Sequence, residues 1–316
     1  MFGLMKKTTL LMLIAAVAVG GAVAYALAPW GERGSVDPRF LPADTLIPMS
    51  HVVSVQSPDS MCFAGEQVPL HHFDVRESLD RELTACAYWH TQTMLIIKKA
   101  DRFFSIIEPI LAEQGMPDDF KYLAITESNL MPTAVSPSKA VGLWQILEGT
   151  GREVGLEVSD EVDERYHIEK STVAACIYLK RLYERMGSWT MAAAAYNNGP
   201  NALAKQVAKQ GETNYYNLLL NSETARYVFR ILAFKAILSN PQAYGFKMRQ
   251  SDIYPRYQYK EVQVDSTISD LAQFARHQGI NYKMLKTLNP WLRDNKLTNK
   301  KQRTYIIKIA TNRPSS

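Results

Sequence analysis

The sequence of 316 residues predicts a mainly α-helical fold, in which a large helical domain is followed by a small β-α-α-β module. Two observations predict this. Between about residues 75 and 245, apolar residues recur at helical spacing, and no alternating pattern longer than a few residues interrupts them. After residue 258, two alternating segments flank two short helical ones. A chain of this length accommodates one large domain and one smaller one.

The large domain is expected over residues 61–250, and its helices follow from apolar periodicity. A long amphipathic stretch runs from Ser78 to Gly115. Met116-Pro117-Asp118-Asp119 then starts a new helix with proline and acids in its first turn, and we expect that helix to end near Ser128 or Asn129. Further helices are predicted at 168–186, 189–197 and 223–239.

The small module is expected over residues 258–311. Tyr259 to Val264 alternates like a strand, and Arg303 to Ile309 does so again. Between them, 267–277 and 282–288 have helical spacing. A unit of about 50 residues is small, and it folds when it is docked or well packed.

The amino-terminal region predicts export. Lys6 and Lys7 precede an apolar run from Leu10 to Leu27, so residues 1–28 are predicted to be a signal peptide or a membrane anchor. Both alternatives place the protein in the periplasm or cell envelope, and an uncut segment would contact the membrane. Residues 29–60 are rich in Pro, Gly, Ser and Asp, which is typical of a linker.

Composition limits the classes of partner. The net charge of +5 is small for this length and no basic block reaches five residues, which argues against a nucleic-acid partner. Cys62, Cys86 and Cys176 lack metal-ligand spacing, so neither a metal site nor a cofactor is expected. Cys62 and Cys86 flank a segment that a disulfide could close in an exported protein, whereas Cys176 is expected to be a buried thiol.

Glu127 is the leading catalytic candidate. It is the only acidic residue between Phe120 and Leu147. Its predicted place in the last turn of a helix, near the negative end of the dipole, disfavours the ionised carboxylate, and partial burial acts in the same direction. Both effects raise the pKa, which suits a general acid that is protonated near neutral pH.

The absence of a nearby second carboxylate predicts an unusual mechanism. Ordinary glycosidases use two carboxylates at a set separation. Here none lies within 20 residues downstream of Glu127, and the next acids, Glu148, Glu153, Asp163 and Glu164, are expected in solvated helix starts and loops. This scarcity indicates chemistry in which the substrate supplies its own nucleophile, and one glutamate acts first as acid and then as base.

Several ordered motifs resemble those of the lytic transglycosylases of the goose-type lysozyme-like group. They are Glu127-Ser128 with Ser136, Gly142-Leu143-Trp144-Gln145-Ile146, Ala195-Tyr196-Asn197-Asn198-Gly199, and Glu223-Thr224-Ala225-Arg226-Tyr227-Val228. The segment from Val162 to Thr172 resembles the membrane-bound lytic transglycosylase D type. The likeness covers roughly residues 75–245 and implies a lysozyme-like helical domain.

The resemblance also implies an activity. Its family cleaves the β-1,4 bond between N-acetylmuramic acid and N-acetylglucosamine in peptidoglycan, leaving a 1,6-anhydromuramoyl end. The partner would be the peptidoglycan glycan strand, with Glu127 as the catalytic residue. The residues that match substrate-binding positions are Ser136, Trp144, Gln145, Tyr196, Asn197 and Tyr227; Trp144 would offer a flat face to a sugar ring. Two alternatives are a muramidase-type hydrolase on the same fold and a non-catalytic wall-binding protein.

The tail resembles a degenerate LysM module, a small peptidoglycan-binding fold. It keeps Thr267, Ile268, Leu271, Ala272 and the ending Leu288-Asn289-Pro290. It has Asp265-Ser266 where the family has Gly-Asp before the threonine. The module is therefore expected either to bind glycan or to dock onto the helical domain.

Overall fold

The computed structural model describes residues 54–311. The predicted signal peptide or anchor, and the linker as far as residue 53, lie outside this part of the chain. Within residues 54–311, no helix combines the length and the apolar character that crossing a membrane requires.

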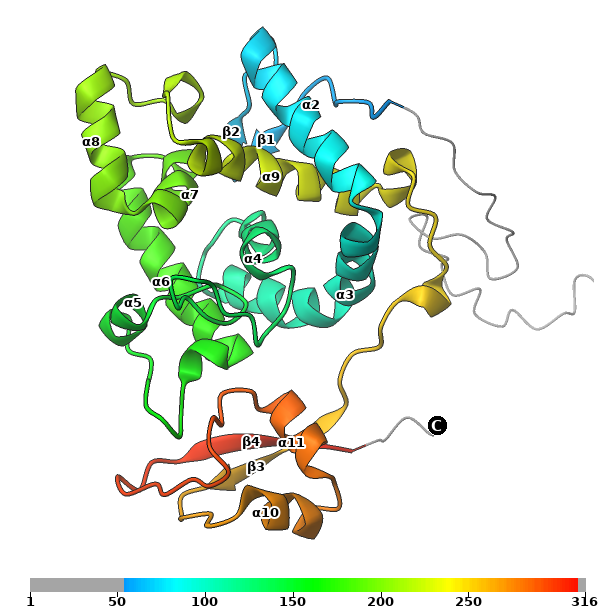
Figure 1. Cartoon of the computed structure of the whole chain (residues 1–316), viewed down its shortest axis with the longest axis vertical. Coiled ribbons are helices and arrows are strands. Elements are labelled where there is room, and N and C mark those ends of the chain that lie inside the picture. The colour runs from blue at the N-terminus through cyan, green and yellow to red at the C-terminus, as the bar shows by residue number, and fades with distance from the viewer. Residues whose placement is uncertain (1–53, 312–316) are drawn as a thin grey trace, which may run out of the picture.

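The large domain is a group of helices arranged around α4 (Figure 1). A hairpin of β1 (Cys62–Phe63) and β2 (Glu66–Gln67) comes first. Helix α4 (Phe120–Ser128) packs on α3 (His90–Glu113) and α9 (Ser222–Ser239), and α2 (Phe73–Tyr88) packs on α9. The other helices are α5 (Glu148–Glu153), α6 (Ile168–Met186), α7 (Trp189–Asn198) and α8 (Pro200–Gln210).

The predicted mainly helical fold is confirmed, with one break that the sequence pattern did not indicate. Helix 168–186 has the predicted bounds, and the predicted helices 189–197 and 223–239 each differ from the observed ones by a single residue. The long stretch up to Gly115 divides into α2 and α3 because Trp89 leaves the helical conformation, with φ −79° and ψ 55°. The division lets α2 turn back and pack along α9.

Helix α4 is short and almost completely buried on the side that carries its apolar residues. It ends at Asn129, which has a left-handed backbone with φ 52°, and Leu130 follows with φ 55°. The ammonium group of Lys99 on α3 donates a hydrogen bond to the carbonyl of Asn129. This cation at the carboxyl end of α4 stabilises the turn that immediately follows Glu127.

The small module has the β-α-α-β order that the sequence predicts. Strand β3 (Tyr259–Val264) pairs antiparallel with β4 (Tyr305–Ala310), with Tyr259 opposite Ala310. Helices α10 (Leu271–His277) and α11 (Tyr282–Leu288) lie between them in the chain. Helix α10 begins four residues later than predicted, because the Asp270 side chain accepts hydrogen bonds from the amides of residues 272 and 273 and caps it there.

The three cysteines are free thiols, so the disulfide that the sequence allowed between Cys62 and Cys86 is not formed. Cys62 lies on the β1–β2 hairpin with its Sγ 3.9 Å from Lys235 Nζ, whereas Cys86 is buried on α2. Cys176 is buried, as predicted. Burial raises the pKa of both Cys86 and Cys176 to about 12, so neither is a reactive thiolate at neutral pH.

Candidate functional site

The site is centred on Glu127 in the last turn of α4. The hydroxyl of Tyr227, on α9, donates a hydrogen bond to the Glu127 carboxylate. Because α4 packs directly on α9, this contact joins two residues that lie 100 positions apart in the chain. Tyr227 is otherwise buried, with 3% of its surface exposed, so its position is fixed by the core.

The surroundings of Glu127 hold much of it in the protonated form near neutral pH. Burial raises the pKa of this carboxyl to about 7, and the negative charge of Glu223 adds to the rise. The hydrogen bond from Tyr227 and the positive charge of Arg230 act in the opposite direction. The sequence predicted the direction of this shift, and a pKa near the working pH suits a group that both gives and accepts a proton.

Tyr196, on α7, connects the carboxylate to the chain segment that follows it. Its hydroxyl donates to the carbonyl of Trp144 over 2.6 Å. Burial first, and the proximity of Glu127 second, raise the pKa of Tyr196 well above its ordinary value, so the phenol stays protonated. Tyr196 thereby holds the turn around Trp144 beside the catalytic candidate.

That turn, Gly142–Ile146, has an unusual backbone. Bridges pair Val141 with both Val135 and Ile146, so residues 135–146 fold back on themselves. Gly142 has φ 81°, and a Cβ there would lie 2.2 Å from the carbonyl oxygen of Arg165, so glycine is required at this position. Gln145 also has a positive φ, of 47°.

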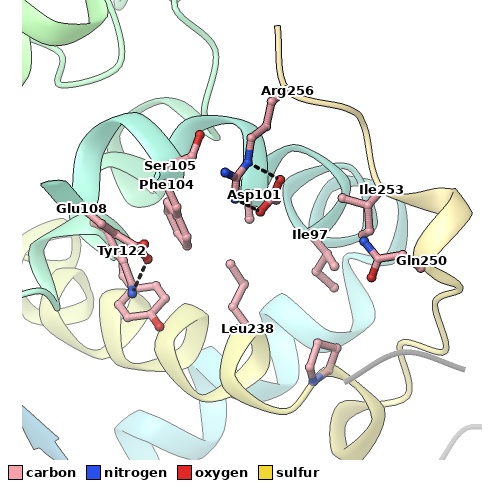
Figure 2. A pocket seen from close by; sticks show the side chains of 13 residues that line it. Ile97, Asp101, Phe104, Ser105, Glu108, Tyr122, Leu238, Gln250, Ile253 and Arg256 are labelled. Atoms are coloured by element: carbon pink, nitrogen blue, oxygen red, sulfur yellow. Dashed lines mark hydrogen bonds and ion pairs between the residues drawn. The ribbon is translucent and has the colours of Figure 1, made fainter. Parts of the chain in front are cut away.

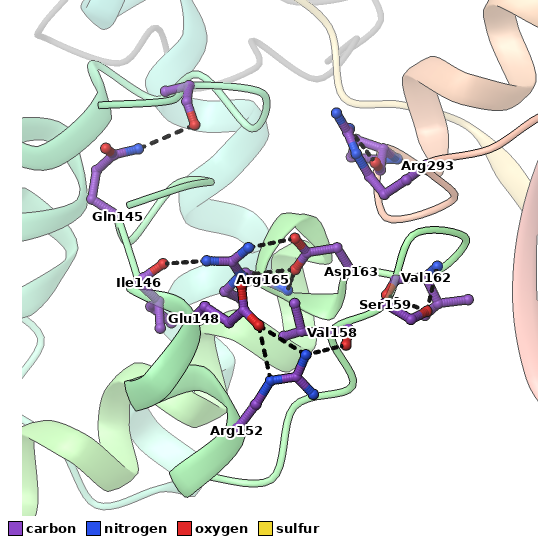
Figure 3. A network of polar contacts seen from close by, with 12 residues as sticks. Gln145, Ile146, Glu148, Arg152, Val158, Ser159, Val162, Asp163, Arg165 and Arg293 are labelled. Carbon is purple, nitrogen blue, oxygen red and sulfur yellow. Dashed lines mark hydrogen bonds and ion pairs between the residues drawn. The ribbon is translucent and has the colours of Figure 1, made fainter. Parts of the chain in front are cut away.

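The side chain of Gln145 stabilises this turn. Its Nε2 donates to the carbonyls of Gly142, at 2.9 Å, and Ala134, at 3.3 Å. Arg165 supports the turn from behind, since its guanidinium donates to the Ile146 carbonyl and forms two hydrogen bonds with the buried Asp163 (Figure 3). Gln145 is only partly buried, so it also faces the surface that a ligand could reach.

Trp144 does not occupy the position that the sequence analysis expected. Its side chain is completely buried, and its indole Nε1 donates to Thr172 Oγ1 over 2.9 Å. An indole with no exposed surface cannot stack on a sugar ring, so the expectation of a flat sugar-binding face is wrong. Trp144 instead fixes the turn to α6 through its side chain and to Tyr196 through its carbonyl.

The remaining two predicted residues lie at the borders of the site. Ser136 closes a tight turn, where its Oγ accepts from the amide of Ala140 and lies 2.9 Å from the hydroxyl of Ser138. Asn197, at the end of α7, donates to Glu223 over 3.2 Å and accepts from Thr224 over 2.8 Å. The structure thus places Glu127, Tyr227 and Tyr196 together, and connects Gln145 and Asn197 to them indirectly.

Sequence reasoning missed the charged residues that tune Glu127. Glu223 belongs to one of the motifs but was not considered as a second carboxylate, and Arg230 lies two residues beyond that motif. The spacing of Glu223, Tyr227 and Arg230 on one helix was an available signal, because residues three and four apart share a face. Glu82, 1% exposed on α2, accepts from both Arg226 and Arg230 and could not have been found from spacing.

Two acids were expected in solvated positions and are buried. Asp163 is 6% exposed and Glu164 is 7% exposed. The reason is their pairing: Asp163 binds Arg165, and Glu164 binds Lys170 and the amide of Glu157. Such ion pairs and hydrogen bonds offset the cost of burying a carboxylate. Neither acid is hydrogen-bonded to Glu127.

A separate cavity lies between α3, α4, α9 and the segment that leads to the small module (Figure 2). Its volume is about 220 Å³, and Asp101 pairs with Arg256 at its border. None of the seven predicted site residues lines it. Among residues 54–311, no group of three or more His, Cys, Asp or Glu side chains gathers in a way that could hold a metal ion.

Two parts of the chain match known protein families. Residues 104–219 match the Transglycosylase SLT domain, and residues 260–313 match the soluble lytic transglycosylase C-terminal LysM-like domain. The chain therefore carries an SLT transglycosylase domain followed by a LysM-like domain, as the motifs indicated. The first match contains Glu127, Ser136, Trp144, Gln145, Tyr196 and Asn197, but ends before Tyr227.

One similar curated protein is membrane-bound lytic murein transglycosylase D of Escherichia coli K12, which is 30% identical over 239 residues. The alignment covers 73% of this chain and 51% of that protein, so the chain spans about half the length of this relative. Among solved structures, the chain is similar to the 70 kDa soluble lytic transglycosylase SLT70 of Escherichia coli, with 22% identity and a TM-score of 0.38 over 48% of this chain and 26% of that one.

Proposed function

We propose that this protein is a peptidoglycan lytic transglycosylase in which Glu127 performs both proton transfers. The observation that carries the proposal is the state of Glu127. It is a partly buried carboxyl with a pKa of about 7, it is bound by Tyr227, and it lies inside a chain segment that matches the SLT domain. A group with this pKa can donate and then accept a proton in one cycle.

In the first step, Glu127 protonates the glycosidic oxygen that leaves C1 of N-acetylmuramic acid. The bond between C1 and that oxygen breaks, and the N-acetylglucosamine side departs with the proton. In the second step, the C6 hydroxyl of the same muramoyl residue bonds to C1 and transfers its proton to the Glu127 carboxylate. The product is a 1,6-anhydromuramoyl end, no water is consumed, and Glu127 is protonated again.

The neighbours of Glu127 have separate roles in this scheme. Tyr227 orients the carboxylate through its hydrogen bond, and Tyr196 fixes the 142–146 turn against it. Gln145, Ser136 and Asn197 border the site and are proposed to contact the glycan strand. Glu223 is exposed and bonded to Asn197, so it is placed to tune Glu127 by its charge.

The proposed location is the cell envelope. The relative that shares 30% identity is described as membrane-bound, and residues 1–28 have the pattern of a signal peptide or anchor. Peptidoglycan lies in the same compartment. Membrane contact through this segment is part of the proposal.

The test is the substitution Glu127→Gln, examined on isolated peptidoglycan. We expect wild-type protein to release fragments with 1,6-anhydromuramoyl ends, and the variant to lose product formation by about 10³-fold or more, since an amide cannot donate the proton. Mass spectrometry of the fragments measures both. Glu113→Gln, the same substitution at an exposed position on α3, is the control for nonspecific effects of substitution.

The products distinguish the alternatives. Reducing muramic ends without anhydro ends would identify a hydrolase on the same fold, with water in place of the C6 hydroxyl. Binding to peptidoglycan without any fragments, equal in wild type and Glu127→Gln, would identify a wall-binding protein. Asp163 and Glu164 are engaged in ion pairs, so neither supplies the second carboxylate of an ordinary glycosidase. Glu223 is the acid whose charge acts on Glu127, so the products decide between the two enzymes.

A further inference from the structure

The LysM-like module contacts a segment of the helical domain, residues 157–169, which we call the docking segment. The backbone of this segment bonds directly to the loop that follows α11: the amide of Asp163 donates to the Trp291 carbonyl, and the amide of Arg293 donates to the Glu161 carbonyl, at 2.9 and 2.8 Å. Val162 and Leu292 form a β-bridge between these two bonds. The module is therefore joined to the helical domain by main-chain pairing.

Three carboxylates of the docking segment bind side chains and amides of the module. Glu161 accepts from both the amide and the hydroxyl of Thr298, at 2.6 and 2.5 Å. Glu157 accepts from Arg303 at 2.7 Å and from Tyr305 at 3.0 Å. The third, Glu169, pairs with Lys308. Each acid lies on the helical domain and each partner lies on the module.

The apolar core of the module continues into the helical domain. Val141, Val162 and Tyr166 belong to the same buried cluster as the module residues Val264, Ile268, Leu271, Leu285, Trp291, Leu292 and Ile307. The guanidinium of Arg293 lies 4.0 Å from the centre of the Tyr166 ring. Without the module, these apolar side chains of the helical domain would be exposed to water.

The docking segment also contacts the 142–146 turn. Val141, in the shared core, directly precedes Gly142. Arg165, held by Asp163, donates to the Ile146 carbonyl (Figure 3). The carbonyl of Arg165 lies against Gly142. A continuous set of contacts thus leads from the module loop 291–298, through the docking segment, to the turn that carries Gln145.

We infer that the LysM-like module acts as an intramolecular support that positions the 142–146 turn, and that its loop 291–298 is committed to this contact rather than to an independent wall-binding site. The residues Glu157 and Glu161 are then positioning residues for the site around Glu127. The inference concerns the geometry of the turn, and its effect on turnover rests on the proposed transglycosylase function.

The test uses the full chain with Glu157→Ala and Glu161→Ala combined. Both side chains are partly exposed, at 20% and 24%, so their removal weakens docking without creating a cavity in the core. Glu157→Gln with Glu161→Gln keeps one acceptor oxygen at each position and removes the charge, and it is the conservative variant. Glu113→Ala with Glu184→Ala changes the charge equally at exposed positions on α3 and α6 and is the matched control.

Three measurements are made on each variant: amide hydrogen exchange in residues 141–146, kcat and KM on a short soluble glycan fragment, and cosedimentation with insoluble peptidoglycan. We expect the double alanine variant to exchange at 141–146 about tenfold faster and to lose about tenfold in kcat, with KM and cosedimentation nearly unchanged. The glutamine pair should recover part of both losses, because one acceptor oxygen remains at each position, and the control pair should match wild type.

Unchanged exchange and unchanged kcat in the double alanine variant would overturn the inference. So would a loss of cosedimentation with normal kcat on the soluble fragment, because that pattern describes a wall-binding module. If wild type forms no product at all, the proposed function fails, but the exchange measurement still tests the support. Should the double variant not fold, Thr298→Val removes one of the same hydrogen bonds from the module side and gives the same three readings.

Discussion

At the residue scale, the pKa of the Glu127 carboxyl is set by groups that lie far from it in the sequence. Burial accounts for most of the raised pKa, and Glu223 and Arg230 act on it with opposite sign. Both lie on α9, four residues before and three residues after Tyr227. One helix therefore carries the hydroxyl that binds Glu127, the negative charge that repels it and the positive charge that attracts it. The position of α9 relative to α4 therefore sets the acidity of the site.

This arrangement predicts opposite pH effects for two substitutions. In the proposed reaction Glu127 is protonated at the start, so we expect activity to decline as the pH rises through its pKa of about 7. Glu223→Gln removes a like charge, lowers that pKa and moves the alkaline limb of the activity profile to lower pH. Arg230→Met removes an opposite charge and moves the limb to higher pH. The measurement is kcat/KM against pH.

Arg230→Lys keeps the positive charge and is the control for the second substitution. Because Glu223 is exposed, its effect should shrink as ionic strength rises. A shift of the limb in the same direction for Glu223→Gln and Arg230→Met would contradict this account of the charges around Glu127.

At the element scale, the Gly142–Ile146 turn is the feature on which the site depends. It carries Gln145 and the Trp144 carbonyl that Tyr196 binds, and it lies directly against the backbone of Arg165. A turn with two positive φ values, at 142 and 145, keeps its shape only because its surroundings hold it. Tyr196, Arg165 and the side chain of Gln145 provide that support.

We expect Gly142→Ala to destabilise the protein by about 3 kcal/mol or more, because the new Cβ would overlap the Arg165 carbonyl oxygen and the backbone has φ 81°. Activity should fall as well, since the turn must move. Urea unfolding and the release of glycan fragments measure the two effects. Gly149→Ala, on α5 with no atom within 4 Å of the new Cβ, is the matched control and should be neutral or slightly stabilising. Equal stability of the two variants would contradict this account, because it would mean that the turn accommodates a Cβ at residue 142 at little cost.

At the scale of the whole molecule, the two domains share a core and a set of ion pairs, so they are expected to unfold together. Glu169 is the acid most affected by this arrangement. Burial opposes its charge, but His167 and Lys308 outweigh burial and lower its pKa to about 2. His167 in turn stacks on Trp291 of the module, with ring centres 5.7 Å apart.

A pH prediction follows from Glu169. A carboxyl whose pKa is lowered by folding contributes stability that is fully present above its unfolded pKa and is lost as the pH falls through the folded one. Wild type should therefore be more stable than Glu169→Gln at pH 6, and the difference should disappear between about pH 4.5 and pH 2. Urea unfolding at a series of pH values measures the difference. A gap that stays constant down to pH 2 would contradict the assignment of this ion pair.

The sequence alone determined the helical class, the order of the module and the identity of Glu127 as the candidate acid. Local signals were sufficient for these: apolar periodicity gave helix 168–186 its observed bounds, and motif spacing singled out one carboxylate. Such signals did not predict the burial of Trp144. Its neighbours in the chain resemble a motif of the lytic transglycosylases, but whether an indole faces water or the core depends on what packs over it.

The tertiary structure alone decided which residues surround Glu127 and where the module packs. Tyr227, Glu223 and Arg230 reach the carboxyl because α9 packs on α4, and the module closes over Val141 and Val162 because the docking segment pairs with its loop. These are contacts between residues about 100 positions or more apart. Their energies depend on distance and burial, which periodicity and composition do not specify.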